Sequence, residues 1–135
     1  LNGAFSVNNK TPPLDFPDDH FNVIYLLSVF THLRIATQNA WLDEFRRVLA
    51  PGGFGLITFH DEDHPALPRA GLNSAELIKQ GAIVHNDSSE GTNFMGVFQS
   101  RAFVKAQAEK RFDVLEITPS GQSGLGQALA VLRKR

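Results

Sequence analysis

Two histidines and three carboxylic acids occupy five consecutive positions near the middle of the chain, in the segment His60-Asp61-Glu62-Asp63-His64. Imidazole and carboxylate groups are ligands that many divalent metal ions accept in proteins. No regular helix or strand presents all of these side chains to one point, however, and a solvated acidic loop after a strand explains the same composition. We therefore predict no metal site here and expect an exposed loop.

Two histidines, His32 and His60, are candidate catalytic bases, because imidazole exchanges protons near neutral pH. His32 follows an apolar segment and could take a proton from an attacking oxygen or nitrogen, or it could cap the helix that comes next. His60 ends a second apolar segment, where it could face a crevice or belong to the solvated loop. Ser28 could contact a bound molecule or simply end a buried strand.

The glycine-rich segment Gly121–Gly126 has the composition of a phosphate-binding loop. Such a loop needs a helix directly after it, so that the helix N-terminus meets the phosphate. A strand pattern follows here instead, which favours the interpretation of a flexible hairpin loop.

Three further segments have both a functional and a structural interpretation. Arg46-Arg47 and Arg133-Lys134-Arg135 are short basic runs on a predicted helix and at the chain end, and we expect both to be solvated. The stretch Phe94–Phe98, which contains Met95, could line a substrate pocket or a lid, but packing in the core is the favoured interpretation.

The elements that position these side chains follow from the apolar pattern. Phe21–Leu27 is apolar on both alternating faces, which is typical of a parallel strand covered on both sides of a sheet. Residues 37–50 carry apolar side chains at helical spacing, and Pro51-Gly52-Gly53 ends that helix. Phe54–Phe59 reads as the next strand. A strand, a helix and a strand joined by short turns predict a right-handed crossover with two parallel strands.

The remaining elements are shorter. Ala4–Asn8 alternates weakly, as a short half-buried strand would. Asn73 predicts the start of a helix that reaches about Gln80, and a further helix is expected to begin near Ser100. Residues 82–96 are expected to form a long loop or a weak strand. The segments 112–117 and 127–132 predict an antiparallel hairpin, so that the fold class is α/β.

Composition narrows the function classes. A chain of 135 residues predicts a single domain over residues 1–135. Its formal net charge of −1 gives no electrostatic argument for nucleic acid or for an acidic membrane surface. With no cysteine, disulfides and thiolate metal sites are excluded. No apolar run approaches the roughly 20 residues that a membrane-spanning helix needs, and we expect a cytoplasmic location.

Two blocks of the sequence resemble class I S-adenosylmethionine-dependent methyltransferases. The first runs from Pro12 to Tyr25 and continues through Ser28-Val29-Phe30-Thr31-His32-Leu33. The second, Trp41–Gly53, is similar to the helix of that family that ends in a Pro-Gly-Gly stop. Together, at this spacing, the blocks are a specific signal over residues 5–60.

The resemblance implies a partial Rossmann-like methyltransferase sheet, with parallel strands and a C-terminal antiparallel hairpin, and S-adenosylmethionine as the cofactor. The family position near the adenine amino group corresponds to Asn9, with Lys10 beside it. The stretch that passes under the cofactor corresponds to Leu26, Leu27 and Ser28. His32 falls in a loop where members of the family often place polar groups on the substrate side.

The family opens with a strand and a glycine-rich loop that approaches the methionine part of the cofactor, and an acidic residue after its second strand holds the ribose. The present sequence starts with what looks like the third strand of the family. We therefore expect a single domain that corresponds to the C-terminal portion of such a domain and that binds the cofactor poorly by itself.

Two functions follow as hypotheses. The first is methyl transfer to a small-molecule or glycan-type acceptor. The alternative is a non-catalytic, truncated methyltransferase-like module that self-associates as a homo-oligomer, because an exposed strand edge and uncovered apolar faces favour contact with a partner.

Overall fold

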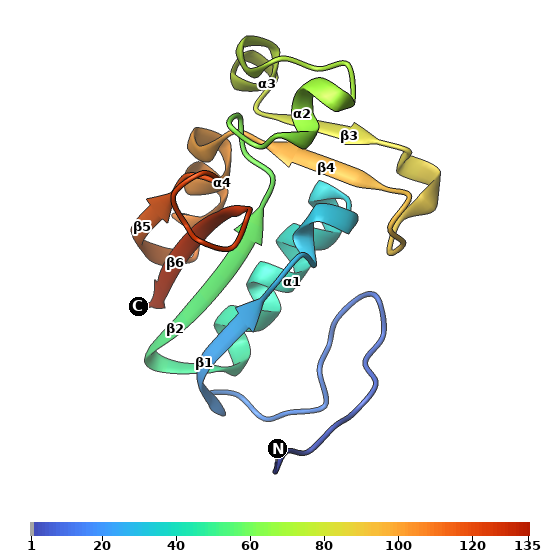
Figure 1. The fold of residues 1–135 in the computed structure, drawn as a ribbon. Helices are drawn as coiled ribbons and strands as arrows, with labels where there is room; N and C mark the ends of the chain where they lie inside the picture. Colours follow the sequence, from blue (N-terminus) through green and yellow to red (C-terminus); the bar gives the residue numbers. More distant parts are fainter. Residues whose placement is uncertain (1) are drawn as a thin grey trace.

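A four-stranded mixed sheet forms the centre of the computed structural model, which describes residues 2–135 (Figure 1). The strands lie in the order β1-β2-β6-β5, with the bounds Phe21–Leu26, Leu49–Phe59, Ala128–Lys134 and Phe112–Thr118. Strands β1 and β2 are parallel, with Tyr25 opposite Leu56, and β6 is antiparallel to both of its neighbours. The predicted parallel pair and the C-terminal hairpin are both confirmed.

Helices α1 (Ile35–Val48) and α4 (Arg101–Ala108) contribute to the core on one face of this sheet. Helix α1 ends two residues earlier than predicted, because Leu49 is already extended and pairs with Phe21 as the beginning of β2. The stacked rings of Trp41 and Phe45 anchor α1 in the core, with centroids 5.6 Å apart. No helix among residues 2–135 has the length and apolar character needed to cross a membrane.

The opposite face of the sheet is largely bare, which makes the prediction of a strand covered on both sides wrong. Val23 and Tyr25 of β1 are 52% and 70% exposed. Phe54, which pairs with Val23 across the sheet and therefore shares its face, is also exposed, as is Leu115 of β5. Strand β1 is moreover an edge strand with one side unpaired.

A smaller unit lies across the carboxyl ends of β1 and β2 (Figure 1). It contains the helices α2 and α3 and the antiparallel strands β3 and β4, with the bounds Ala66–Arg69, Ser74–Gln80, Ala82–His85 and Gly96–Gln99. Asn73 caps α3, as predicted, and α4 begins near Ser100, as predicted, with Ser100 as its cap. A β-bridge between His60 and Phe98 joins the unit to the end of β2. The segment 82–96, expected to be a long loop or a weak strand, contains both: the short strand β3, and between β3 and β4 a loop with a single turn of 3-10 helix, η2 (Asp87–Ser89).

The N-terminal segment, residues 2–20, contains no strand or helix, so the strand predicted at Ala4–Asn8 is wrong. A strand needs a partner for its backbone groups, and no strand of the sheets pairs with this segment. The side chains of Phe5 and Val7 are fully or nearly fully exposed.

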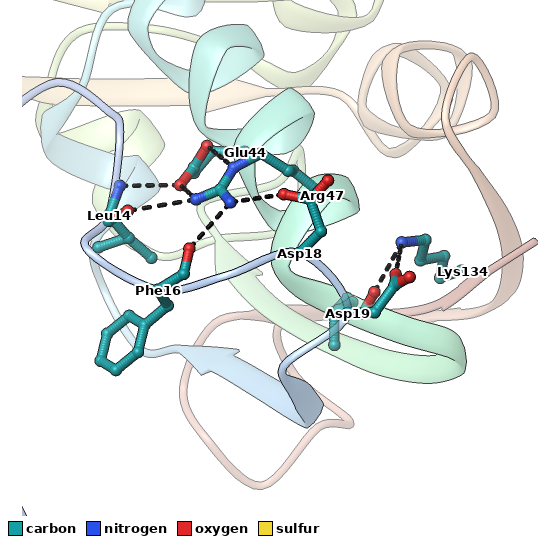
Figure 2. A network of polar contacts seen from close by, with 8 residues as sticks. Leu14, Phe16, Asp18, Asp19, Glu44, Arg47 and Lys134 are labelled. Atoms are coloured by element: carbon teal, nitrogen blue, oxygen red, sulfur yellow. Dashed lines mark hydrogen bonds and ion pairs between the residues drawn. The ribbon is translucent and has the colours of Figure 1, made fainter.

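Arg47 holds the later part of this segment against α1 (Figure 2). Its guanidinium donates to the carbonyls of Leu14 and Phe16, at 3.2 and 2.9 Å, and to the carboxylate of Asp18 at 2.8 Å. Buried Glu44 accepts hydrogen bonds from Arg47 and from the Leu14 amide, and the hydrogen bond from Arg47 is the main cause that lowers the pKa of Glu44. The prediction that Arg46-Arg47 is only a solvated run is therefore wrong for Arg47.

Arg133 and Arg135 of the basic C-terminal run are exposed, as predicted, whereas the side chain of Lys134 is only 13% exposed. Lys134 donates to the carbonyl of Leu49 at 2.7 Å and to the Asp19 carboxylate at 2.6 Å (Figure 2). Arg135 donates to Asp113 and to the carbonyl of Phe112. These contacts attach the end of β6 to the beginning of β2, to β5 and to the turn before β1.

Candidate functional site

Two cavities lie near the carboxyl ends of β1 and β2, and His32 lines both of them. The Ser28 cavity has a volume of about 420 Å³ and is lined by Asn8, Asn9, Lys10, Ser28, Val29, His32, Leu33, Trp41, Glu90 and Gly91. The His60 cavity has a volume of about 340 Å³ and lies among the short helix η1 (Phe30–His32), the end of β2, α2 and the β3–β4 hairpin. Ligands of open α/β sheets bind outside the carboxyl ends of the strands, which is where both cavities lie.

Ser28 adopts a left-handed backbone conformation, with φ of 56°. Three hydrogen bonds hold it there: its amide donates to Thr58 Oγ1, its hydroxyl accepts from Gln127, and its carbonyl accepts from Thr31. A non-glycine residue in this conformation carries strain, which is often found at ligand sites. The carboxyl end of β1 is therefore fixed in one shape beside the cavity.

Asn9 and Lys10 line the Ser28 cavity together with Ser28, although their positions are far apart in the sequence. Trp41 closes one side of it and donates from Nε1 to the carbonyl of Lys10 at 2.8 Å, which attaches the N-terminal segment to α1. Leu26 and Leu27, predicted to contact the cofactor, do not line this cavity. Leu26 is buried in the core, and the side chain of Leu27 is 55% exposed.

Glu90 is a functional candidate that the sequence did not indicate, because it lies in the segment expected to be a loop without structure. Its carboxylate lines the Ser28 cavity and accepts hydrogen bonds from Thr37 Oγ1 at 2.6 Å and from the Arg34 amide at 3.0 Å. The hydrogen bond from Thr37 is the main cause that lowers the pKa of Glu90. The carboxylate is thus ionised and fixed at the wall of the cavity.

His32 has a defined tautomer. Its Nδ1 atom lies 2.8 Å from the carbonyl oxygen of Met95, and because a carbonyl only accepts, Nδ1 carries the proton and donates it. In the neutral ring this leaves Nε2 with a free lone pair, the form that a general base requires. The alternative of a helix cap is not observed, since α1 has no side-chain cap hydrogen bond.

His60 stacks on His64, with ring centroids 3.9 Å apart, and contacts Phe98 on the β4 strand. Burial, followed by the proximity of His64 and His32, lowers the pKa of His60 to about 4. His64 accepts a hydrogen bond from the Ala66 amide at Nδ1, and burial lowers its pKa as well. Both rings are therefore neutral at neutral pH.

Asp61 corrects the prediction of a solvated acidic loop, because its side chain is fully buried. It accepts hydrogen bonds from Arg101 Nη1 and from Ser120 Oγ, each at 2.5 Å. Glu62 accepts from the Arg101 amide at 2.9 Å. Within residues 2–135 no group of three or more such side chains is placed to hold a metal ion.

The rest of the His60 cavity comes from residues that the sequence did not assign to a site, chiefly Arg69 of α2 and His85 of β3. The stretch Phe94–Phe98 has both of the roles considered for it. Met95 and Phe98 are buried, whereas Phe94 is 78% exposed, and all three line the cavity. The segment Gly121–Gly126 connects β5 to β6, as predicted for a hairpin loop.

The chain is similar in sequence and in fold to known proteins. Residues 5–57 match the family model described as a methyltransferase domain. A Pyrococcus horikoshii protein aligns with 99% of the chain at 21% identity and a TM-score of 0.66. A SAM-dependent methyltransferase of Methanosarcina mazei aligns with 96% at 17% identity and a TM-score of 0.66.

The 1,6-didemethyltoxoflavin-N1-methyltransferase of Burkholderia thailandensis, solved with 1,6-didemethyltoxoflavin and S-adenosylhomocysteine, aligns with 90% of the chain at 13% identity and a TM-score of 0.63. The chain spans 60%, 66% and 46% of the length of these three proteins, respectively. These findings confirm the resemblance to methyltransferases and show a partial methyltransferase fold of the Rossmann-like type.

Proposed function

We propose that this chain takes part in S-adenosylmethionine-dependent methyl transfer to a small-molecule or glycan-type acceptor. The observation that carries the proposal is that two cavities near the carboxyl ends of the parallel strands share one histidine, His32. The Ser28 cavity would hold the methyl donor and the His60 cavity the acceptor. The Burkholderia relative, which was solved with a small acceptor and S-adenosylhomocysteine, supports this division.

The residues of the Ser28 cavity fit the proposed donor. Trp41 offers an aromatic surface and Asn9 offers an amide that can bond to an adenine amino group. The Glu90 carboxylate is ion-paired with Lys10 and Arg34 and fixes the wall of the cavity. When bound, S-adenosylmethionine supplies a methyl group on a positively charged sulfur. What the chain must add is mainly proximity and orientation.

His32 has the tautomer that proton removal requires. The nucleophilic oxygen or nitrogen of the acceptor forms a bond to the methyl carbon, while the carbon–sulfur electron pair stays with sulfur. Nε2 of His32 takes the proton that the nucleophile loses, and Nδ1 keeps its hydrogen bond to Met95. His60, with a pKa of about 4, is a weaker base and serves better as a neutral hydrogen-bond partner of the acceptor.

Titration of the isotopically labelled chain with S-adenosylhomocysteine, followed by amide NMR, tests the proposal. We expect weak binding, in the millimolar range or about −4 kcal/mol. The shifted resonances should belong to residues of the Ser28 cavity. Asn9→Ala should weaken binding roughly three- to tenfold, whereas Asn93→Ala, which changes the other cavity, should not. Shifts that avoid the Ser28 cavity would contradict the proposal.

A second candidate function, a non-catalytic module that self-associates, is favoured by the bare face of the sheet. Val23, Tyr25 and Phe54 lie together on this face, next to the unpaired edge of β1. A further cavity of about 250 Å³ lies along β1, and it is lined by Val23 of that strand and by Phe16 of the N-terminal segment. Exposed apolar faces and open strand edges favour association.

Light scattering at high micromolar concentration measures this association directly. We expect a dimer or larger assembly for the chain, and a monomer for Tyr25→Lys, because a charge in the contact would have to be desolvated. Leu125→Lys is the matched control, since Leu125 is similarly exposed but lies in the loop between β5 and β6. A monomeric wild-type chain would exclude this second function.

A further inference from the structure

The His60 cavity has an unusual charge pattern. Its lining contains the guanidinium of Arg69 and the imidazoles of His32, His60 and His85, but no carboxylate. Among residues 2–135 no side chain forms an ion pair with Arg69. The cavity therefore offers a positive charge that the described part of the chain does not neutralise.

The carboxylates nearest to this cavity along the β3–β4 hairpin are committed elsewhere. Asp87 pairs with Arg34 at 2.5 Å, and Glu90 accepts hydrogen bonds from Thr37 and from the Arg34 amide. Asp61, beyond the end of β2, is held by Arg101. An anion that neutralises Arg69 would consequently have to come from a bound molecule.

The same cavity has an apolar side formed by Phe94, Met95 and Phe98. The ring of Phe94 is 78% exposed, although its backbone is fixed: its carbonyl accepts from Asn86 Nδ2 at 2.8 Å and its amide donates to Thr92. A large apolar side chain held in water beside a cavity is a surface that a ligand ring would cover.

We infer that the His60 cavity binds an acceptor that combines an aromatic ring with a carboxylate. The ring packs against Phe94 and Phe98, the carboxylate pairs with Arg69, and the atom to be methylated faces His32. The cavity volume of about 340 Å³ is in the range of sites for small molecules. That the ligand is a methyl acceptor rests on the proposed function. The preference of the cavity for a negatively charged ligand does not.

Two probes with the same ring and hydroxyl group separate charge from shape: 4-hydroxybenzoate and the uncharged 4-hydroxybenzamide. Titrated into the labelled chain and followed by amide NMR, both should shift resonances of the β3–β4 hairpin, including Phe94 and Gly96. We expect the carboxylate to bind about two- to fivefold more tightly than the amide, because one exposed ion pair contributes at most about 1 kcal/mol.

Arg69→Gln should remove the difference between the two probes while leaving the amide probe unaffected. Arg46→Gln is the matched control, because Arg46 is also an exposed arginine but lies on α1, away from the cavity. The inference would be overturned if the two probes bound the wild-type chain with equal affinity. It would also be overturned if the carboxylate probe kept its advantage over the amide probe in Arg69→Gln. Failure of S-adenosylhomocysteine to shift the Ser28 cavity would count against the proposed function alone, since the probe experiment contains no methyl donor.

Discussion

Replacing Asp61 by asparagine is expected to lower the free energy of unfolding by about 3–5 kcal/mol, the usual cost of breaking a buried charge pair. The carboxylate is fully buried and faces donors from two other segments, Arg101 of α4 and Ser120 of the loop after β5. Asparagine has nearly the same shape, but its NH₂ group would have to face either Arg101 or the side of the carboxylate on which the Asp63 amide donates. At least one buried hydrogen bond is then lost and the guanidinium loses its buried counter-charge.

Urea unfolding followed by circular dichroism measures this loss, and Asp63→Asn is the matched control. Asp63 also accepts from Arg101 Nη1, at 2.6 Å, but its side chain is 53% exposed. An exposed pair contributes at most about 1 kcal/mol, so the control should unfold near the wild-type midpoint. If the two variants lose the same amount of stability, then Asp61 does not connect the end of β2 to α4 and to the β5–β6 loop.

The Asp61 network also shows where sequence reasoning reaches its limit. The partners of Asp61 lie 40 and 59 residues away in Arg101 and Ser120. The local sequence pattern indicates that five polar residues follow a strand. It does not indicate which of them will be buried by a helix and a loop that lie far away in the sequence. The interpretation as a solvated loop was reasonable for Asp63 and wrong for Asp61.

The elements that were predicted correctly are those whose causes are local. The parallel pair of β1 and β2 follows from apolar periodicity and a Pro-Gly-Gly stop, and the caps at Asn73 and Ser100 follow from single side chains. The strand expected at Ala4–Asn8 failed because a strand also needs a neighbour, and pattern does not supply one.

The same distinction between local and distant causes applies to the residues of the candidate site. Ser28 and His32 were indicated because they directly follow a strand at the edge where α/β sheets bind ligands. Glu90 and Arg69 enter the two cavities only because the β3–β4 hairpin and α2 fold over that edge. Leu26 and Leu27 were assigned through the resemblance, and strand geometry directs one into the core and the other into solvent.

Acidification is expected to destabilise the chain through His60 before most carboxylates are protonated. The folded protein holds the pKa of His60 at about 4, against an ordinary value of 6.5, so both states are neutral above that ordinary value. Between the two values the unfolded chain takes up a proton and the folded chain does not. Stability therefore falls as the pH falls through this window, by at most about 1.4 kcal/mol per pH unit.

The physical cause lies in the surroundings of the ring. Nδ1 of His60 is buried without a hydrogen-bond partner, so a proton there would have no acceptor, and burial also lowers the pKa of the stacked His64. Because part of the ring still reaches solvent, we expect the free energy of unfolding to fall by about 1–2 kcal/mol between pH 7 and pH 5, which is less than the maximum slope would give over this range. Glu44 and Glu90, whose pKa values are lowered, contribute to acid unfolding mainly below this range.

Urea unfolding at both pH values compares the wild-type chain with His60→Phe, which keeps an aromatic ring between His64 and Phe98 but cannot titrate. The variant should lose clearly less stability on acidification than the wild type; the remaining loss would come from His64, whose pKa is lowered in the same direction. Proton NMR of the His60 ring provides the direct check. A titration midpoint close to 6.5 would show that the ring is solvated, and the geometry of the His60 cavity would then need to be revised.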